Sequence, residues 1–289
     1  MISPGRLLKF AELCLGVVVR EVSEYSSRYS RKDFTQWQLM TLCCLMQKYK
    51  RKYRDFIEIL EVATKLQEFL GLEKIPHFTT LNKFFLRMRA KVFAIMLYAS
   101  SGKSSGDTSV DSVSFDRRHA SRSYTERAKM HIKSIKSTPV VDIETQKILE
   151  RHNTTTRKHD SQIMLPLLKK TRQRHKIKTV RGDCGYDDQK IRKSLRKDKI
   201  RPLIKHREFK PLQKAWNKRM KKKDYGQRWK SETVNSVVKR KYGDDVSSKK
   251  WNTQFKELDL RYFVYNIDVD LRKLSVYLIG FLRSNFLQV

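Results

Sequence analysis

The sequence predicts an α/β protein in which a mixed sheet flanked by helices follows an all-α N-terminal region. Within residues 1–100, apolar side chains recur at the three- and four-residue spacing of helices. From residue 108 onward, short segments instead alternate between apolar and polar side chains, as strands do. The two regions are separated by SSGKSSGDTS at 100–109, a small polar stretch that is typical of a linker.

The N-terminal region is predicted to consist of helices joined by short turns. Thr35 is a suitable N-cap for the helix that follows it, a second helix is expected over 54–70, and a third begins at Thr79 or Thr80. The last two helices resemble a helix-turn-helix, in which the second, basic helix contacts DNA. An ordinary helical bundle with a solvated basic face explains this pattern equally well. The candidate DNA contacts are Asn82, Lys83, Arg87 and Arg89.

Residues 108–204 contain the strands of the predicted sheet. Three strands are expected in succession, followed by a helix, a strand, a helix and a strand, which is the order of a mixed α/β domain. The first strand covers 108–115, and the fourth ends at Asp183. Residues 205–223 hold nine basic side chains against one acid, so we expect a flexible or inserted basic segment there. Helices follow from residue 225, and the apolar run in the last one is too short to span a bilayer.

The positive charge of the chain indicates a polyanionic partner. The formal net charge is +34, and it is concentrated in 101–200 (+13) and 201–250 (+12). Lysine and arginine that neutralise phosphates release counterions, so nucleic acid is the natural partner. A ribosome-type structural protein would carry a similar charge, and a high net charge can also serve only to keep a protein soluble. The four cysteines lack the spacing of a zinc site, and unpaired cysteines suit a reducing cytoplasm.

Three acids stand out by their positions. Asp111 lies within the first predicted strand, Asp183 ends the fourth, and Glu232 lies on a later helix. A carboxylate in or just after a strand costs desolvation energy unless it is paired or binds a cation. Each acid alone could be an ordinary capping or turn residue. Together they provide the oxygen ligands that hard divalent cations such as Mg²⁺ prefer.

The helix around Glu232 carries a regular set of polar side chains. Tyr225, Arg228, Glu232 and Lys239 are separated by steps of 3, 4 and 7 residues, which place side chains on one face of a helix. The spacing is also that of a common surface ion pair between Arg228 and Glu232, which needs no enzyme to explain it.

The pattern Tyr-x2-Arg-x3-Glu-x6-Lys resembles the signature of DDE-type insertion-sequence transposases of bacteria and archaea. VDSVSF at 110–115 is similar to the first-strand motif of that family, and RGDCGYD at 181–187 is similar to its second-acid motif. HDS at 159–161 and YNI at 265–267 also resemble recurring pieces of the family. The resemblance extends over roughly residues 109–268.

The resemblance implies an RNase H-like catalytic domain over 107–270, preceded by a DNA-binding region at 1–100 and followed by a C-terminal helix at 271–289. Asp111, Asp183 and Glu232 would be the catalytic acids and would together bind two Mg²⁺ or Mn²⁺ ions. By the same resemblance, Arg228 and Lys239 would hold phosphates, and Tyr225 would orient the DNA end. Lys83 and Arg87 remain the candidates for DNA contact in the N-terminal region.

The implied activity is cleavage at the ends of a transposon, followed by transfer of the freed 3′-OH into target DNA. The implied partners are the terminal inverted repeats, the target DNA and a second copy of the chain. We expect a cytoplasmic protein associated with the nucleoid. Two other readings remain open: a nuclease of the same fold that does not join strands, and a DNA-binding protein derived from a transposase.

Several neighbouring residues compete for roles in this predicted site. Asp107 and Asp116 flank Asp111 and are alternative first acids. Asp187 and Asp188 are expected to start a helix. Four histidines could assist the acids, although solvated surface histidine explains each of them. They are His119, His131, His152 and His159.

Overall fold

The computed structural model describes residues 5–117, 134–156 and 158–286. The chain forms two compact units, Ser101–Phe255 and a helical unit composed of Met1–Ser100 with Lys256–Val289. The long helix α13 (Trp251–Phe286) belongs to both units. It runs without a break through residues 270 and 271, where the sequence suggested a boundary between a catalytic domain and a separate C-terminal helix.

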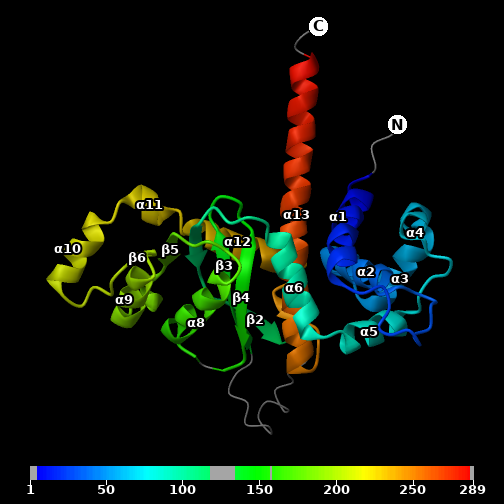
Figure 1. Ribbon diagram of the computed structural model, residues 1–289, viewed down its shortest axis with the longest axis horizontal. Coiled ribbons are helices and arrows are strands. Elements are labelled where there is room, and N and C mark those ends of the chain that lie inside the picture. Colours follow the sequence, from blue (N-terminus) through cyan, green and yellow to red (C-terminus); the bar gives the residue numbers. More distant parts are fainter. Residues whose placement is uncertain (1–4, 118–133, 157, 287–289) are drawn as a thin grey trace. The chain divides into compact units, whose positions relative to one another are not determined.

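Six further helices form the helical unit (Figure 1): α1 (Arg6–Glu21), α2 (Gln36–Lys48), α3 (Tyr53–Val62), α4 (Thr64–Leu70), α5 (Phe78–Arg87) and α6 (Ala90–Ser101). Thr35 caps α2, as predicted, and it shares a capping box with Gln38. The helix predicted over 54–70 is broken at Ala63, where ψ is 58°. The third predicted helix starts at Phe78 and is broken at Met88, whose ψ of 134° separates α5 from α6. The role of this third predicted helix in DNA binding remains a prediction.

The other unit contains a seven-stranded mixed sheet. Its strands are β1 (Asp107–Val110), β2 (Val113–Arg117), β3 (Ser134–Asp142), β4 (Ile148–Thr154), β5 (Thr179–Gly182), β6 (Arg201–Ile204) and β7 (Asp245–Val246). β1 and β2 pair antiparallel with β3 in one continuous register, so they form a single strand interrupted at Asp111 and Ser112. β4 lies on the far side of β3, whereas β5 and β6 continue the sheet parallel to β1. This confirms the predicted α/β class and its RNase H-like arrangement.

Helices flank this sheet on both faces. α8 (Asp160–Arg172) and α9 (Gln189–Lys197) pack on the face that includes Val110 and Val140. Successive strand residues point to opposite faces, so Ser109 faces the other way, toward α12 (Trp229–Tyr242). The hydroxyls of Ser109 and Ser231 lie 2.9 Å apart. α12 is therefore fixed against the strand that leads to Asp111.

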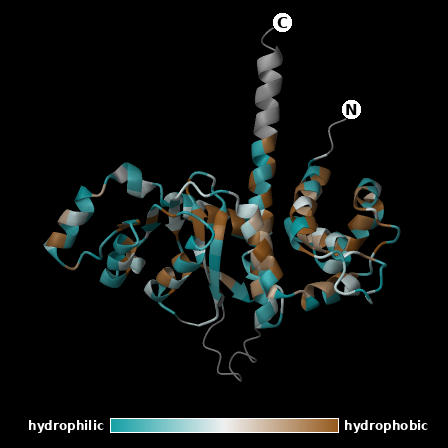
Figure 2. Cartoon of the chain, viewed as in Figure 1, coloured by the Kyte–Doolittle hydropathy of each residue, from teal (hydrophilic) through white to brown (hydrophobic). Residues whose placement is uncertain are grey.

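The basic segment at 205–223 is more regular than expected. It contains α10 (Pro211–Arg219), which begins with a proline suited to the first turn and buries none of its residues. Most of α10 is hydrophilic or intermediate in hydropathy (Figure 2). The short helix α11 (Lys222–Gly226) follows it. Among the helices in the described part of the chain, none is long and apolar enough to cross a membrane.

Candidate active site at the end of the first strand

Asp111 immediately follows β1, at the interruption between β1 and β2. Its side chain is partly buried, and burial raises the pKa of its carboxyl group. Arg228 lowers this pKa and Asp183 raises it, with a further increase from Glu232. Asn235 donates a hydrogen bond from Nδ2 to Oδ2 of Asp111 over 3.2 Å, which lowers the pKa. Asp111 therefore lies in a cluster of charged and polar groups contributed by three segments of the chain.

Asp183 is brought to this cluster by strand pairing. β5 runs parallel to β1 with Ser109 opposite Arg181, and the same register continued two residues further places Asp183 opposite Asp111. Oδ1 of Asp183 accepts a hydrogen bond of 2.8 Å from the amide of Gly185 and so caps a short 3₁₀ helix. A Cβ atom on Gly185 would lie 2.9 Å from that same oxygen. A side chain at this position would therefore displace the carboxylate of Asp183 from its capping contact.

Glu232 lies in the first turn of α12. Its Oε1 is 2.5 Å from a guanidinium nitrogen of Arg228, and half of its side chain is exposed. Buried Ser231, Val234 and Val238 hold α12 on the sheet, which keeps Glu232 beside Asp111. Neighbouring Tyr225, Glu232 and Asp111 raise the pKa of Arg228, although burial acts in the opposite direction. The guanidinium is thus fully charged among the acids.

The set predicted to share one helix face is divided in the structure. Tyr225 lies on α11, and α12 begins only at Trp229. Tyr225 nevertheless lies near Arg228 and Asp183, and burial raises the pKa of its hydroxyl. Lys239 lies further along α12, with Nζ 5.7 Å from the ring centre of Phe115.

The alternative first acids lie elsewhere. Asp107 is at the opposite end of β1, where its Oδ2 is 3.3 Å from a guanidinium nitrogen of Arg181. Asp116 is exposed on β2 and pairs in register with Asp245. Asp111 is the acid of the three that the continued β1–β5 register places opposite Asp183.

The remaining candidates are more dispersed. Asp188 caps α9, as expected, and Asp187 binds Arg192. Burial lowers the pKa of His152 on β4, and His159 caps α8. His119 and His131 lie outside the described residues. Lys83 and Arg87 lie on α5 in the helical unit.

A hydrogen-bonded group that sequence reasoning missed lies directly after Asp111. Oγ of Ser112 is 2.5 Å from Oδ1 of Asp160, 2.8 Å from Oγ1 of Thr138 and 3.1 Å from the hydroxyl of Tyr186. Tyr186 is buried and belongs to the turn that Asp183 caps. The group therefore links the segments that carry Asp111 and Asp183. The resemblance of HDS at 159–161 to a family motif drew attention to Asp160, but it did not predict this contact.

Asn235 was also missed, although its spacing held a signal. It lies three residues after Glu232, so both side chains can reach toward the same end of the sheet. Its amide is buried, and its Oδ1 has no hydrogen-bond donor within the described part of the structure. A buried polar side chain inside a helix is a reasonable candidate for a site residue.

The donor set fits a hard divalent cation. Asp111 and Asp183 offer carboxylate oxygens side by side, and their mutual repulsion is of the kind that a bound cation relieves. Within the described ranges, no group of three or more His, Cys, Asp or Glu side chains is arranged to hold an ion. Glu232, the third predicted acid, is ion-paired with Arg228.

Comparisons with known proteins identify the family of the chain and its fold. The profile of a family described as "Transposase DDE domain" matches residues 103–267. Among solved structures, the chain is similar to the piggyBac transposase in a cryo-EM synaptic complex with hairpin DNA, with a TM-score of 0.50 and 10% sequence identity. This similarity covers 96% of the present chain and 74% of the other, and at this identity it shows a shared fold. No curated protein matches the sequence.

Proposed function

Because the chain belongs to the transposase family defined by the DDE domain, we propose that it cuts DNA at transposon ends and transfers the freed 3′-OH into target DNA. The observation that carries the proposal is the convergence of Asp183, Glu232 and Arg228 on the partly buried carboxyl of Asp111. A purely structural ion pair would not require two further acids at the same strand end.

In this proposal, Asp111, Asp183 and Glu232 are the catalytic acids and would together hold two Mg²⁺ or Mn²⁺ ions. When bound, such ions activate the attacking oxygen and stabilise the leaving oxygen of a phosphodiester. The hydrogen bond from Asn235 favours the ionised form of Asp111 and so keeps it able to act as a ligand. Glu232 becomes a ligand by leaving Arg228.

The released Arg228 then has a second role. Its guanidinium group can donate two hydrogen bonds to a phosphate, so we assign it to the scissile phosphate, where negative charge builds up during the reaction. Tyr225, beside Arg228 and Asp183, orients the end of the DNA strand. Lys239 lies two turns beyond Glu232 on α12, so we assign it to a phosphate farther along the same DNA strand.

The reaction consists of two in-line displacements. Water attacks the phosphorus at the transposon end, a P–O bond forms as the bond to the 3′ oxygen breaks, and the proton of the water passes to solvent. The free 3′-OH then attacks a phosphodiester of the target, whose own 3′ oxygen leaves. Both ends of the element must be held together for this outcome, so we propose that two copies of the chain act as a dimer on DNA.

The test uses purified protein, Mg²⁺ or Mn²⁺, and a duplex that carries the repeats flanking the gene. We expect nicking at the repeat end and joining to a labelled target. Asp111→Asn, Asp183→Asn and Glu232→Gln should each abolish cleavage and retain DNA binding. Asp116→Asn, which removes an exposed acid from the neighbouring strand, is the matched control and should cleave normally.

The outcomes separate the alternatives. Cleavage without joining would indicate a nuclease rather than a transposase. Binding without metal-dependent cleavage by the unmodified protein would indicate a DNA-binding derivative. Normal cleavage by any one of the three acid variants would remove that residue from the proposed site.

A further inference from the structure

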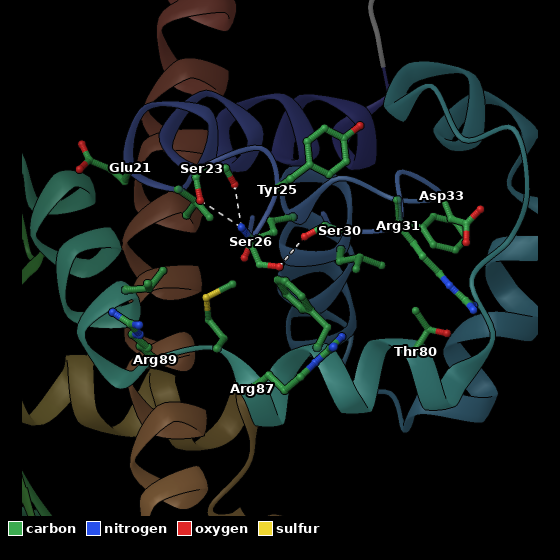
Figure 3. A pocket seen from close by; sticks show the side chains of 17 residues that line it. Glu21, Ser23, Tyr25, Ser26, Ser30, Arg31, Asp33, Thr80, Arg87 and Arg89 are labelled. Atoms are coloured by element: carbon green, nitrogen blue, oxygen red, sulfur yellow. Dashed lines mark hydrogen bonds between the residues drawn. The ribbon is translucent and has the colours of Figure 1, made fainter. Parts of the chain in front are cut away.

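The helical unit contains a pocket of about 760 Å³ (Figure 3). One wall is the connection from α1 to α2, which contributes Ser23, Ser26, Ser30 and Arg31. The opposite wall is the end of α5 and the turn into α6, with Arg87 and Arg89. Two segments more than fifty residues apart in the sequence therefore supply basic and hydroxyl groups to one cavity.

The charges around this pocket leave most of the arginine donors available. The acids that line it are Glu21 and Asp33, and Asp33 is bound by Lys74 over 2.6 Å, an ion pair that lowers the pKa of Asp33. Arg87 uses only Nε internally, in a long 3.3 Å contact with the carbonyl of Lys83. Within the described ranges, neither Arg31 nor Arg89 makes a side-chain hydrogen bond or salt bridge, although the charge of Arg31 helps to lower the pKa of Asp33.

The other lining residues limit the kind of ligand. Phe34, Phe84, Met88 and Val92 provide apolar surface between the arginines. A ligand that combines oxyanions with an uncharged, partly apolar body matches this surface. The phosphodiester backbone has this character because phosphates alternate with deoxyribose along it. Guanidinium and hydroxyl groups are suitable donors to phosphate oxygens.

We propose that this pocket, which we call the arginine pocket (Arg31, Arg87 and Arg89 with the serines of the α1–α2 connection), binds the backbone of duplex DNA. The inference rests on the proposed function, because it takes DNA as the partner, and it assigns a contact site for that partner in the helical unit. The pocket makes phosphate contacts that position the DNA, so its contribution to affinity is independent of base sequence.

The test measures the affinity for a fluorescein-labelled duplex of arbitrary sequence across a series of salt concentrations. Each phosphate contact contributes about 0.9 to the slope of log K against log salt. Removing all three arginines by Arg31→Ala, Arg87→Ala and Arg89→Ala should therefore lower the slope by roughly 2.7. Each single variant should lower it by about 0.9 and weaken binding equally for unrelated duplexes.

The matched control is Arg28→Ala in the same connection. Arg28 does not line the pocket, and its guanidinium lies 4.6 Å from the ring centre of its neighbour Tyr29. This variant loses the same charge three residues from Arg31 and should leave the slope unchanged. A slope for the triple variant that equals that of Arg28→Ala would overturn the inference.

A second measurement needs no variant and so does not depend on folding of the mutants. Hydrogen exchange of the unmodified chain should show that DNA slows exchange of amides in 23–34 and 87–92. Binding of DNA without protection of either segment would also overturn the inference, while the proposed function would stand. Failure of the unmodified chain to bind any duplex would instead remove the proposed function itself.

Discussion

Asn235 donates a hydrogen bond of 3.2 Å to Asp111 from the helix that carries Glu232. This one contact connects the first and third acids of the proposed site through α12. The helix is fixed in turn by the contact between Ser231 and Ser109, two residues before Asp111. A displacement of α12 would therefore alter the carboxylate of Asp111 and the position of Glu232 together.

The first prediction concerns Asn235→Ala. Loss of the hydrogen bond should raise the pKa of Asp111 further, because the bond favours the ionised carboxylate. The acid limb of the cleavage-rate profile should therefore move to higher pH, and the maximal rate should fall by about 10- to 100-fold, as is usual for partners of metal ligands. The measurement is the nicking rate as a function of pH. Ser236→Ala, at an exposed position next in the chain, should behave like the unmodified protein. An unchanged profile for Asn235→Ala would contradict the assigned role.

The second prediction concerns Arg228→Ala. If Arg228 serves only in a surface pair with Glu232, its loss should change stability by no more than about 1 kcal/mol and leave the chemistry intact. We expect instead a loss of about 100-fold in cleavage, because the guanidinium stabilises charge on the phosphate. Arg228→Lys should recover only part of the rate, because an ammonium group lacks the planar fork.

The control for this prediction is Arg240→Ala, an exposed arginine on the same helix. It removes the same charge twelve residues after Arg228. Equal rates for Arg228→Ala and Arg240→Ala, measured at saturating DNA, would leave Arg228 as an ordinary surface residue.

Some residues of the proposed site could be predicted from the sequence because they belong to a regular local pattern. The carboxylates Asp111 and Asp183 could be found because each lies in or at the end of a predicted strand, and the parallel pairing of β1 with β5 then places them opposite each other. The spacing from Arg228 to Glu232 correctly predicted their contact. These features depend on residues that are close in sequence or on the regular geometry of strands.

Other features depend on contacts that local pattern cannot reveal. The helix that contains Tyr225 ends at Gly226, and the chain turns before α12 starts. The prediction that Tyr225 and Glu232 share one continuous helix face was therefore wrong. Ser112 meets Asp160 and Tyr186 only after α8 packs on the sheet. The arginine pocket joins a polar connection to a distant helix end, and its local composition resembles that of any surface loop.

The third prediction concerns Asp160→Ala. The carboxylate of Asp160 holds Ser112 and also pairs with Lys136 over 2.8 Å. Loss of a partly buried, hydrogen-bonded acid should reduce the free energy of unfolding by about 2 kcal/mol, measured by urea denaturation. The double variant with Ser112→Ala should be less destabilised than the sum of the two single variants, since they share one interaction. If the losses of unfolding free energy in the two single variants simply added up in the double variant, the contact between Ser112 and Asp160 would contribute no coupling energy.

Asp198→Ala is the matched control for charge. Asp198 pairs with Arg172 at the surface, where both side chains are more than one-third exposed. Its loss makes the chain more positive by the same amount as Asp160→Ala, but should cost less than about 1 kcal/mol. A cost for Asp198→Ala equal to that for Asp160→Ala would mean that general charge repulsion, rather than the Ser112 contact, explains the effect.

The fourth prediction concerns the pH dependence of stability at Asp142. This acid is fully buried at the end of β3 and accepts hydrogen bonds from Ser104, Ser105 and Thr145, among others. Burial alone would raise its pKa, but the hydrogen bonds outweigh burial and lower it. A lowered pKa in the folded state means that the carboxylate stabilises the fold above its unfolded pKa of about 3.9 and loses this effect as pH falls below that value.

We therefore expect Asp142→Asn to lose about 2 kcal/mol of unfolding free energy at neutral pH, because an amide cannot accept the same hydrogen bonds at both positions. The difference between the variant and the unmodified protein should shrink as pH falls through the folded pKa of Asp142. Urea denaturation at a series of acidic pH values measures this difference. Glu150, whose pKa is also lowered by Arg151 and Lys170 despite burial, keeps part of the pH dependence in the variant. If the difference in unfolding free energy instead grew as the pH fell, Asp142 would not be held as a carboxylate in the folded protein.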